Sequence, residues 1–255
     1  MLTQMPSRPE TPSKLHVAIL LDGNGRWAAL RGMPRPEGHR AGVAAVRRVV
    51  SAAPGMGIGI LTLYAFSSNN WERPSGEVSS LLSLLEDYLR ADAPRCAAEG
   101  IRMRVIGRRD RIPRSLAEAI HEAESITADG DALDLRIAID YSSRDAILRA
   151  ACWMLSSLEV SQREFGRRLG EVTNSGGPVP DVDLLIRTGG ERRLSDFLLW
   201  ECAYAELFFS PRMCPNFSPK TSPKPSTTSS PATAASAASQ NPSAPTDTEP
   251  PVRVS

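Results

Sequence analysis

The chain has 255 residues, of which 41% are hydrophobic and 23% are charged, a composition ordinary for a globular protein with one large core and a tail. The formal net charge of +1 argues against broad electrostatic capture of nucleic acid. The four cysteines are widely spaced and form no CxxC pair, so the sequence indicates neither a disulfide framework nor a zinc site. No apolar run approaches the roughly 20 residues that span a bilayer, and residues 1–14 lack the apolar core of a signal peptide. We therefore expect a cytoplasmic protein.

Apolar runs alternate with segments of helical periodicity between residue 15 and about residue 209. The runs predict strands at 15–21, 58–65, 101–106, 133–139 and 182–187, and a short apolar segment follows at 207–209. The segments between them predict helices at about 40–53, 77–92, 113–127, 143–158 and 195–206. Because repeated strand–helix units need crossover connections, the sequence predicts a single α/β domain with a mostly parallel central sheet of about six strands flanked by helices.

The composition changes at about Ser210, where Pro, Ser, Thr and Ala become dominant. Such a segment buries too little apolar surface to offset its conformational entropy. We therefore expect a flexible N-terminus over 1–14, a folded domain over 15–209 and a divergent tail over 210–255 that is disordered, at the latest from residue 218.

The first predicted strand runs directly into Asp22, followed by Gly23, Asn24, Gly25 and Arg26. The glycine spacing formally matches a dinucleotide-binding turn, but residues 41–51 contain no acid to bind a ribose, and the Lys-Ser/Thr ending of a P-loop is absent. A third interpretation uses the acid: Asp22 holds Mg²⁺, which bridges a diphosphate, while backbone N–H groups and Arg26 bind the remaining oxygens. An Asx-turn with an exposed Arg26 stays open as a purely structural alternative.

Further polar loops follow the other predicted strands. Arginines, hydroxyls and glycines are frequent at 66–73, 107–109, 141–144 and 187–193. Since ligands of parallel α/β sheets bind beyond the carboxyl ends of the strands, these loops are expected at one edge. That edge suits a ligand with more than one phosphate group.

Four motifs, HVAILLDGNGRWA, GHRAG at 38–42, LTLYAFSSNNWERPSGEV and DLLIRTGGERRLSDFLLWECAYAELFF, together resemble the cis-prenyltransferase family of the undecaprenyl diphosphate synthase type. The resemblance covers about residues 15–209. It implies a Mg²⁺-dependent transferase that condenses isopentenyl diphosphate with an allylic prenyl diphosphate, with farnesyl diphosphate as the expected primer, into a cis-polyprenyl diphosphate resembling the undecaprenyl lipid-carrier precursor. It further implies a homodimer, with peripheral contact at the inner face of the membrane.

The resemblance also implies roles for single residues. Asp22 would contact Mg²⁺ and diphosphate, and Glu206 would complete the metal site across a dimer interface. Ser67 and Asn70 would lie at the condensation site, and the helix from Glu77 onward would wall an apolar tunnel, although its leucines and Tyr88 also suit an ordinary core. The substrate-binding residues would be Arg187, Arg193 and Ser195 for isopentenyl diphosphate, Gly23, Asn24, Gly25, Arg26, Arg35 and His39 for the allylic diphosphate, Trp27 beside them, and Trp71 and Arg73 in a closing loop.

Three positions depart from the family pattern. Asn69 replaces a usual Glu, and Ser142-Ser143 replaces a usual Gly-Gly, which should stiffen that turn. The usual C-terminal helix with its basic ending is not recognisable after Phe209. Two alternatives therefore stay beside the enzyme: a catalytically impaired partner subunit, and a synthase of short or irregular prenyl diphosphates.

Overall fold

Six strands form one sheet in which every neighbouring pair is parallel. In the computed structural model, which describes residues 14–155 and 160–221, the strand order is β3-β4-β2-β1-β5-β6. The predicted α/β fold and its parallel sheet are confirmed. The strands are β1 (Leu15–Leu20), β2 (Ile58–Ser67), β3 (Ile101–Ile106), β4 (Leu133–Tyr141), β5 (Leu184–Arg187) and β6 (Glu206–Phe209).

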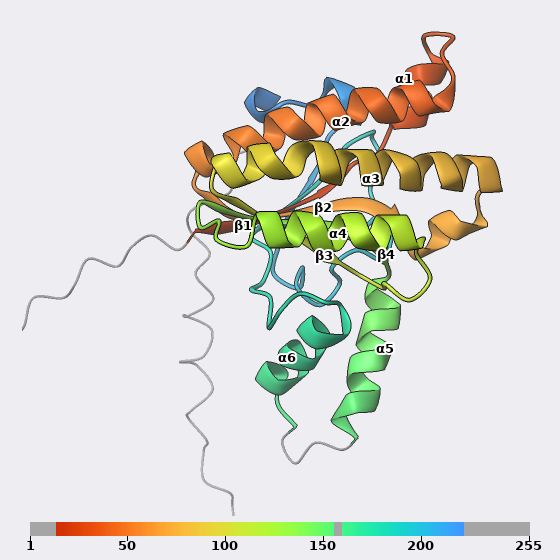
Figure 1. Cartoon of the computed structure of the whole chain (residues 1–255). Coiled ribbons are helices and arrows are strands. Elements are labelled where there is room, and N and C mark those ends of the chain that lie inside the picture. The colour runs from red at the N-terminus through yellow and green to blue at the C-terminus, as the bar shows by residue number, and fades with distance from the viewer. Residues whose placement is uncertain (1–13, 156–159, 222–255) are drawn as a thin grey trace, which may run out of the picture. The chain divides into compact units, whose positions relative to one another are not determined.

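Helices cover both faces of the sheet (Figure 1). Three helices lie side by side over one face and enclose the larger core: α2 (Arg35–Ala52), α3 (Ser75–Ala98) and α4 (Arg114–Ile126). The other side carries α5 (Ser143–Met154) and α6 (Gln162–Val172), which pack on each other, and a second core around Phe197. Both faces of the sheet are thus buried, which explains why its strands read as continuous apolar runs.

Two helices were not predicted. The short helix α1 (Asn24–Ala29) begins directly after Gly23, in the turn that follows β1. Helix α6 begins after Ser161, whose hydroxyl accepts a hydrogen bond from the backbone N–H of Glu164 at 3.1 Å. This Ser-x-x-Glu spacing is a recognised helix start and was available in the sequence.

The prediction of a helix at 195–206 is wrong, because this segment is a series of turns. Ser195, Asp196 and Leu198 have φ angles of 50°, 62° and 47°, which a right-handed helix excludes. The Asp196 carboxylate accepts hydrogen bonds from the Ser142 hydroxyl at 2.5 Å and from the Arg144 backbone N–H at 2.8 Å. The segment is therefore bound to the start of α5 instead of forming hydrogen bonds within a helix of its own.

The packed domain continues past the boundary predicted at Phe209. Cys214 and Phe217 are buried, and Phe217 belongs to the larger core. The backbone N–H of Cys214 donates to the Asp22 carbonyl at 3.0 Å. Residues 222–255 of the predicted tail and residues 1–13 lie outside the described residues. Among the helices of the described chain, none is long and apolar enough to cross a membrane.

Candidate active site

Asp22 and Arg187 meet where the strand order reverses. In the register of β1 and β5, Leu20 lies beside Arg187, so Asp22, just beyond β1, lies beside the end of β5. Arg187 Nη2 donates to Asp22 Oδ2 at 2.9 Å, although the two residues are 165 positions apart in the sequence. The point where the strand order reverses is where open α/β sheets bind ligands.

Arg187 is fixed by three acceptors. Its side chain is only 6% exposed, and its Nη1 donates to the Arg193 carbonyl at 2.5 Å and to the Ser195 hydroxyl at 2.6 Å. Asp22 in turn accepts from the Gly23 backbone N–H at 2.6 Å and from Arg26 at 3.4 Å. Burial opposes ionisation of Asp22, but the hydrogen bond and charge of Arg187 outweigh it and hold the pKa of this carboxyl below its ordinary value. Asp22 is therefore a carboxylate at neutral pH.

The turn that carries Asp22 depends on Gly23 and on Thr188. The Thr188 hydroxyl accepts from the Asp22 backbone N–H at 2.8 Å and donates to the Asp22 carbonyl at 2.7 Å. Gly23 has φ 100°, and a Cβ there would lie 3.0 Å from Met213. Only glycine fits this conformation and this close approach. Sequence analysis missed the role of Thr188, although its place in the IRTGG motif marked it.

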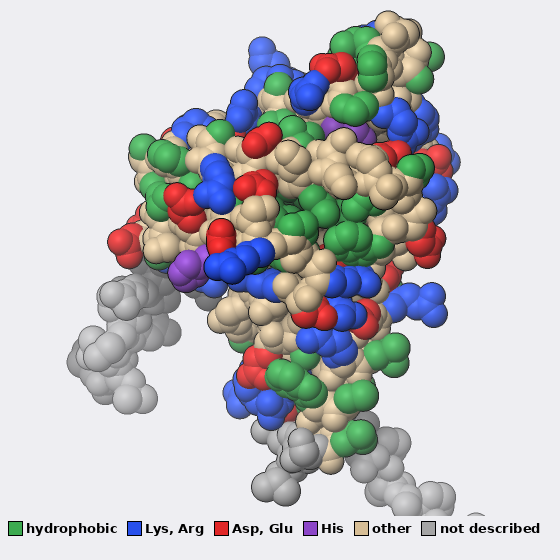
Figure 2. Space-filling view, turned by 45° about the vertical axis from the view of Figure 1, so that its right-hand side comes forward, with side chains coloured by type: hydrophobic (Ala, Val, Ile, Leu, Met, Phe, Trp, Pro, Cys, Tyr) green, Lys and Arg blue, Asp and Glu red, His purple; other side chains and the backbone are tan. Residues whose placement is uncertain are grey.

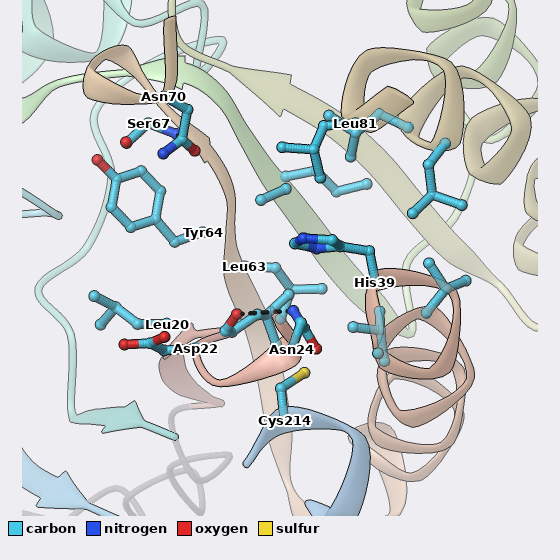
Figure 3. A pocket seen from close by; sticks show the side chains of 18 of the residues that line it. Leu20, Asp22, Asn24, His39, Leu63, Tyr64, Ser67, Asn70, Leu81 and Cys214 are labelled. Atoms are coloured by element: carbon cyan, nitrogen blue, oxygen red, sulfur yellow. Dashed lines mark hydrogen bonds between the residues drawn. The ribbon is translucent and has the colours of Figure 1, made fainter. Parts of the chain in front are cut away.

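A cleft of about 390 Å³ opens beside Asp22 and Arg187 (Figure 3). Figure 3 shows Asp22, Tyr64, Ser67 and Asn70 on one side, with His39 across from them. The polar part is lined by nine of the predicted site residues: Asp22, Asn24, His39, Ser67, Asn70, Arg73, Arg187, Arg193 and Ser195. The remaining wall is mostly apolar and includes Leu21, Val43, Val46, Leu81, Leu84, Leu85, Tyr88 and Ile137. The cleft is therefore polar and cationic at one end and apolar at the other.

A further cationic side chain, Arg35, lies next to Arg73. Arg35 and Arg73 both donate to Glu77, at 3.3 and 2.9 Å. The Arg35 guanidinium lies against Gly25, where a Cβ would be 3.0 Å from its central carbon. Burial, and after it the charge of Arg73, lower the pKa of His39, with Glu77 acting in the opposite sense. The His39 imidazole is therefore neutral near pH 7, and within the described chain its Nε2 has no hydrogen-bond partner.

Tyr64 is a cleft residue that sequence analysis missed. Its hydroxyl donates to the Tyr141 carbonyl at 3.1 Å, and its ring stacks on Phe197 with centroids 4.4 Å apart. The apolar run that contains Tyr64 predicted a strand, but nothing in the sequence showed that this side chain borders a cleft.

The structure does not bring Trp27 and Trp71 to the cleft. Trp27 Nε1 donates to the Asn216 side chain at 3.1 Å, so its ring is held by the C-terminal segment. Trp71 Nε1 donates to the Asp140 carboxylate at 2.9 Å. Both indoles thus have structural partners outside the cleft.

Glu206 lies far from Asp22 within one chain. It is the first residue of β6 and pairs with Leu184 at the start of β5, whereas Arg187 ends that strand. Any meeting of Glu206 with Asp22 therefore requires a second copy. Across the described residues, no group of three or more His, Cys, Asp or Glu side chains could hold a metal ion.

A cationic end joined to an apolar wall, at the carboxyl edge of a parallel sheet, suits an amphipathic phosphate ester. Comparison with known proteins specifies the class of protein. The sequence model of the family described as "Putative undecaprenyl diphosphate synthase" matches residues 20–223. Isoprenyl transferase 1 of Bradyrhizobium diazoefficiens is 54% identical over 217 residues, 85% of each chain. The isoprenyl transferase of Caulobacter vibrioides is 43% identical over 215 residues, 83% of each chain.

Solved structures agree with this. The crystal structure of lavandulyl diphosphate synthase from Lavandula x intermedia, in complex with dimethylallyl diphosphate, has a TM-score of 0.75 and 33% identity, covering 80% of this chain and 89% of that one. A "probable undecaprenyl diphosphate synthase" from Campylobacter jejuni has a TM-score of 0.67 and 32% identity, covering 80% and 88%. Fold, site and relatives define a prenyl-transferring enzyme. The chain belongs to the undecaprenyl diphosphate synthase family of cis-prenyltransferases, as its motifs predicted.

Proposed function

We propose that the cleft condenses isopentenyl diphosphate with an allylic prenyl diphosphate, farnesyl diphosphate being the primer, to give a cis-polyprenyl diphosphate. The observation that carries the proposal is the buried Arg187, paired with Asp22 at one end of a cleft whose other end is walled by aliphatic side chains. A diphosphate needs charge-assisted donors, and a prenyl chain needs an apolar wall. The cleft offers both in one cavity.

Isopentenyl diphosphate would bind at Arg187, Arg193 and Ser195. Arg187 already holds the Arg193 carbonyl and the Ser195 hydroxyl, so it shapes the loop that receives the diphosphate. The Arg193 side chain is 64% exposed and pairs with Glu191 at the surface. Such a pair contributes little to stability, so Arg193 can exchange Glu191 for a diphosphate oxygen at small cost.

The allylic diphosphate would bind at the backbone of Gly23 to Arg26, with Arg26, Arg35 and His39 around it. The present partners of Arg26 are Asp22 and Glu191, and that of Arg35 is Glu77; the two arginine side chains are 49% and 60% exposed. They are therefore available to a ligand that carries more negative charge than one carboxylate.

The reaction breaks the bond between the allylic carbon and its diphosphate, forms a bond to the terminal alkene carbon of isopentenyl diphosphate, and releases diphosphate and a proton. Arg26 and Arg35 would neutralise charge on the departing diphosphate. Asp22 fits a Mg²⁺ ion that arrives with substrate, because Mg²⁺ sites commonly combine one or two carboxylates with substrate phosphates. The Asp22 side chain is ionised and 34% exposed, so it can offer an oxygen to the ion. Bound there, Mg²⁺ would stabilise the same developing charge.

The test is to incubate the purified chain with labelled isopentenyl diphosphate, farnesyl diphosphate and Mg²⁺ and to chromatograph the products. Products longer than farnesyl diphosphate would support the proposal, and their length would be read in the same run. The likeness to lavandulyl diphosphate synthase favours one further incubation, with dimethylallyl diphosphate as the sole substrate, because a product that joins two dimethylallyl units would appear there. Absence of product in every arm would favour the impaired partner subunit.

A homodimer completes the proposal. Large apolar side chains are exposed on α5 (Leu148 and Trp153), on the segment before β6 (Trp200 and Tyr204) and in β6 itself (Leu207). Figure 2 shows exposed apolar side chains on the part of the molecule that α5 forms. An exposed apolar patch of this kind is typical of an interaction site. If two chains pair through this patch, Glu206 of one chain would complete the metal site of the other. Light scattering coupled to size exclusion should give twice the mass of one chain.

Peripheral contact with the inner face of the membrane follows from the product, because a long prenyl chain is lipid-like. Cosedimentation with anionic vesicles, in the presence and absence of substrates, would test it.

A further inference from the structure

The loops that follow β2 and β3 meet at the carboxylate of Asp140, near the end of the neighbouring strand β4. Ser68 Oγ and Trp71 Nε1 donate to Asp140 Oδ1 at 3.2 and 2.9 Å. Arg111 donates to both carboxylate oxygens, each at 2.6 Å. We call these four side chains the Asp140 cluster. It joins the loop after β2 and the loop after β3 to the end of β4.

Asp140 is an unusual residue to bury. Its side chain is fully buried, and its φ of 50° lies in the left-handed region that most residues avoid. A buried carboxylate is costly unless it is paired and hydrogen-bonded, and the two-point contact with Arg111 supplies the pairing. A strained and buried acid of this kind persists only where its surroundings hold it in place.

The cluster holds a segment of the cleft. Ser68 and Trp71 belong to the 3-10 helix η2 (Ser68–Glu72), which also carries Asn70. The Asn70 side chain accepts from the Ser67 backbone N–H at 3.0 Å, and Asn70 lines the cleft together with Arg73. The position of Asn70 therefore depends on how η2 is attached to the sheet.

We propose that Asp140 is a positioning residue: paired with Arg111, it binds Ser68 and Trp71 and so keeps Asn70 and Arg73 directed into the cleft. No direct contact of Asp140 with substrate is involved. The effect on catalysis rests on the proposed function of the cleft, whereas the attachment of Trp71 can be measured independently of it.

The experiment compares Asp140→Gly with Asp140→Asn. Glycine and asparagine both tolerate positive φ, so neither change should strain the backbone. They differ in the side-chain oxygen, which asparagine keeps for Trp71 and Ser68 and glycine lacks. The glycine variant should lower kcat/KM for prenyl transfer at least tenfold, and the asparagine variant should restore it to within about threefold of the parent protein.

The structural readout uses a protein in which the three other tryptophans, Trp27, Trp153 and Trp200, are replaced by Phe. Acrylamide quenching of the remaining Trp71 should increase severalfold in the Asp140→Gly variant and stay near the parent value in Asp140→Asn. Should Asp140→Gly fail to fold, Arg111→Gln takes its place, because the Arg111 side chain is 41% exposed. Arg111→Gln should also increase quenching, and Arg114→Gln, at a 93% exposed neighbour, should not.

Unchanged Trp71 quenching in folded Asp140→Gly, or in Arg111→Gln where it is used instead, would overturn the proposal. So would a glycine variant with normal kcat/KM, or an asparagine variant as impaired as the glycine variant. A parent protein that makes no prenyl product would instead refute the proposed function, and the quenching experiment would still decide whether Asp140 holds η2.

Discussion

Replacing Arg187 by Ala tests the site most directly, because the side chain has both a structural and a binding role. It loses two hydrogen bonds to neutral acceptors, the Arg193 carbonyl and the Ser195 hydroxyl, and one ion pair with Asp22. At about 1.5 kcal/mol for each of these two bonds from a charged donor, and about 1 kcal/mol for an ion pair whose acid can be hydrated, the free energy of unfolding should fall by roughly 4 kcal/mol. For a domain of this size that corresponds to a Tm lower by about 8–16 °C.

The Arg187→Ala change should also weaken the binding of isopentenyl diphosphate, independently of its effect on stability. Losing one charge-assisted contact to a diphosphate costs about 1.5–3 kcal/mol, so the KM for isopentenyl diphosphate should rise roughly 10- to 150-fold. Arg193→Ala is the matched control, since the Arg193 side chain is 64% exposed and pairs only with Glu191 among the described residues. It should raise the same KM and leave the Tm within about 2 °C.

The assays are thermal unfolding by circular dichroism and steady-state kinetics with each substrate varied in turn. An Arg187→Ala protein with normal Tm and normal KM for isopentenyl diphosphate would refute the reasoning. A rise confined to the KM for the allylic substrate would mean that the two diphosphate subsites are exchanged.

Further predictions concern Asp22, Tyr88, the buried groups His16 and Glu201, and the C-terminal tail. Asp22→Ala should lower turnover by orders of magnitude while circular dichroism stays native, and near-normal turnover would contradict the proposed metal-binding role. Tyr88→Ala should lengthen the chromatographed products by at least one isoprene unit, whereas Tyr88→Phe should not, because the buried ring forms part of the apolar wall. Burial lowers the pKa of His16 from 6.5 to about 4, so its contribution to stability should decrease as the pH falls from 6.5 toward 4, where only the unfolded imidazole is protonated. Burial raises the pKa of Glu201 from 4.5 to about 7, so the contribution of Glu201 to stability should decrease as the pH rises from 4.5 to 7. In the Glu201→Gln variant only the His16 effect remains, so its Tm should be lower at pH 5 than at pH 7. The same pH profile of Tm in the variant and in the parent protein would contradict both assignments. Truncation after Thr221 should leave the Tm within about 2 °C of the full chain, because a Pro/Ser/Ala-rich segment contributes little apolar burial; a larger loss would show that the tail packs on the domain.

The sheet was predictable from the sequence because each strand is a short, continuous apolar run between polar turns. Burial on both faces removes the alternation of polar and apolar residues and leaves runs such as IGILTLYA that are easy to locate. The chemistry of the site was predictable in kind for the same reason, since Asp22 and the arginines stand directly after such runs. Their identity as donors and acceptors needed no tertiary structure.

The end of the folded domain was less predictable. Averaged composition places the boundary at Phe209, yet Cys214 and Phe217 are buried. Two isolated apolar residues among prolines and serines give no periodicity, and their burial depends on surfaces supplied by β1 and α2. Only the packed structure shows which single residues find such a surface.

The contacts that define the site were decided by tertiary structure. Asp22 and Arg187 meet because β1 and β5 are neighbours, a consequence of strand order and of the side on which each crossover passes. The predicted helix at 195–206 is absent because Asp196 binds the start of α5, and local propensity carries no information about a partner more than 50 residues away. The sequence by itself therefore determined which elements form the sheet and which functional groups stand at its edge, since these depend on neighbouring residues. Which of those groups touch was decided by hydrogen bonds and packing between distant segments, whose energies exist only once the chain has folded.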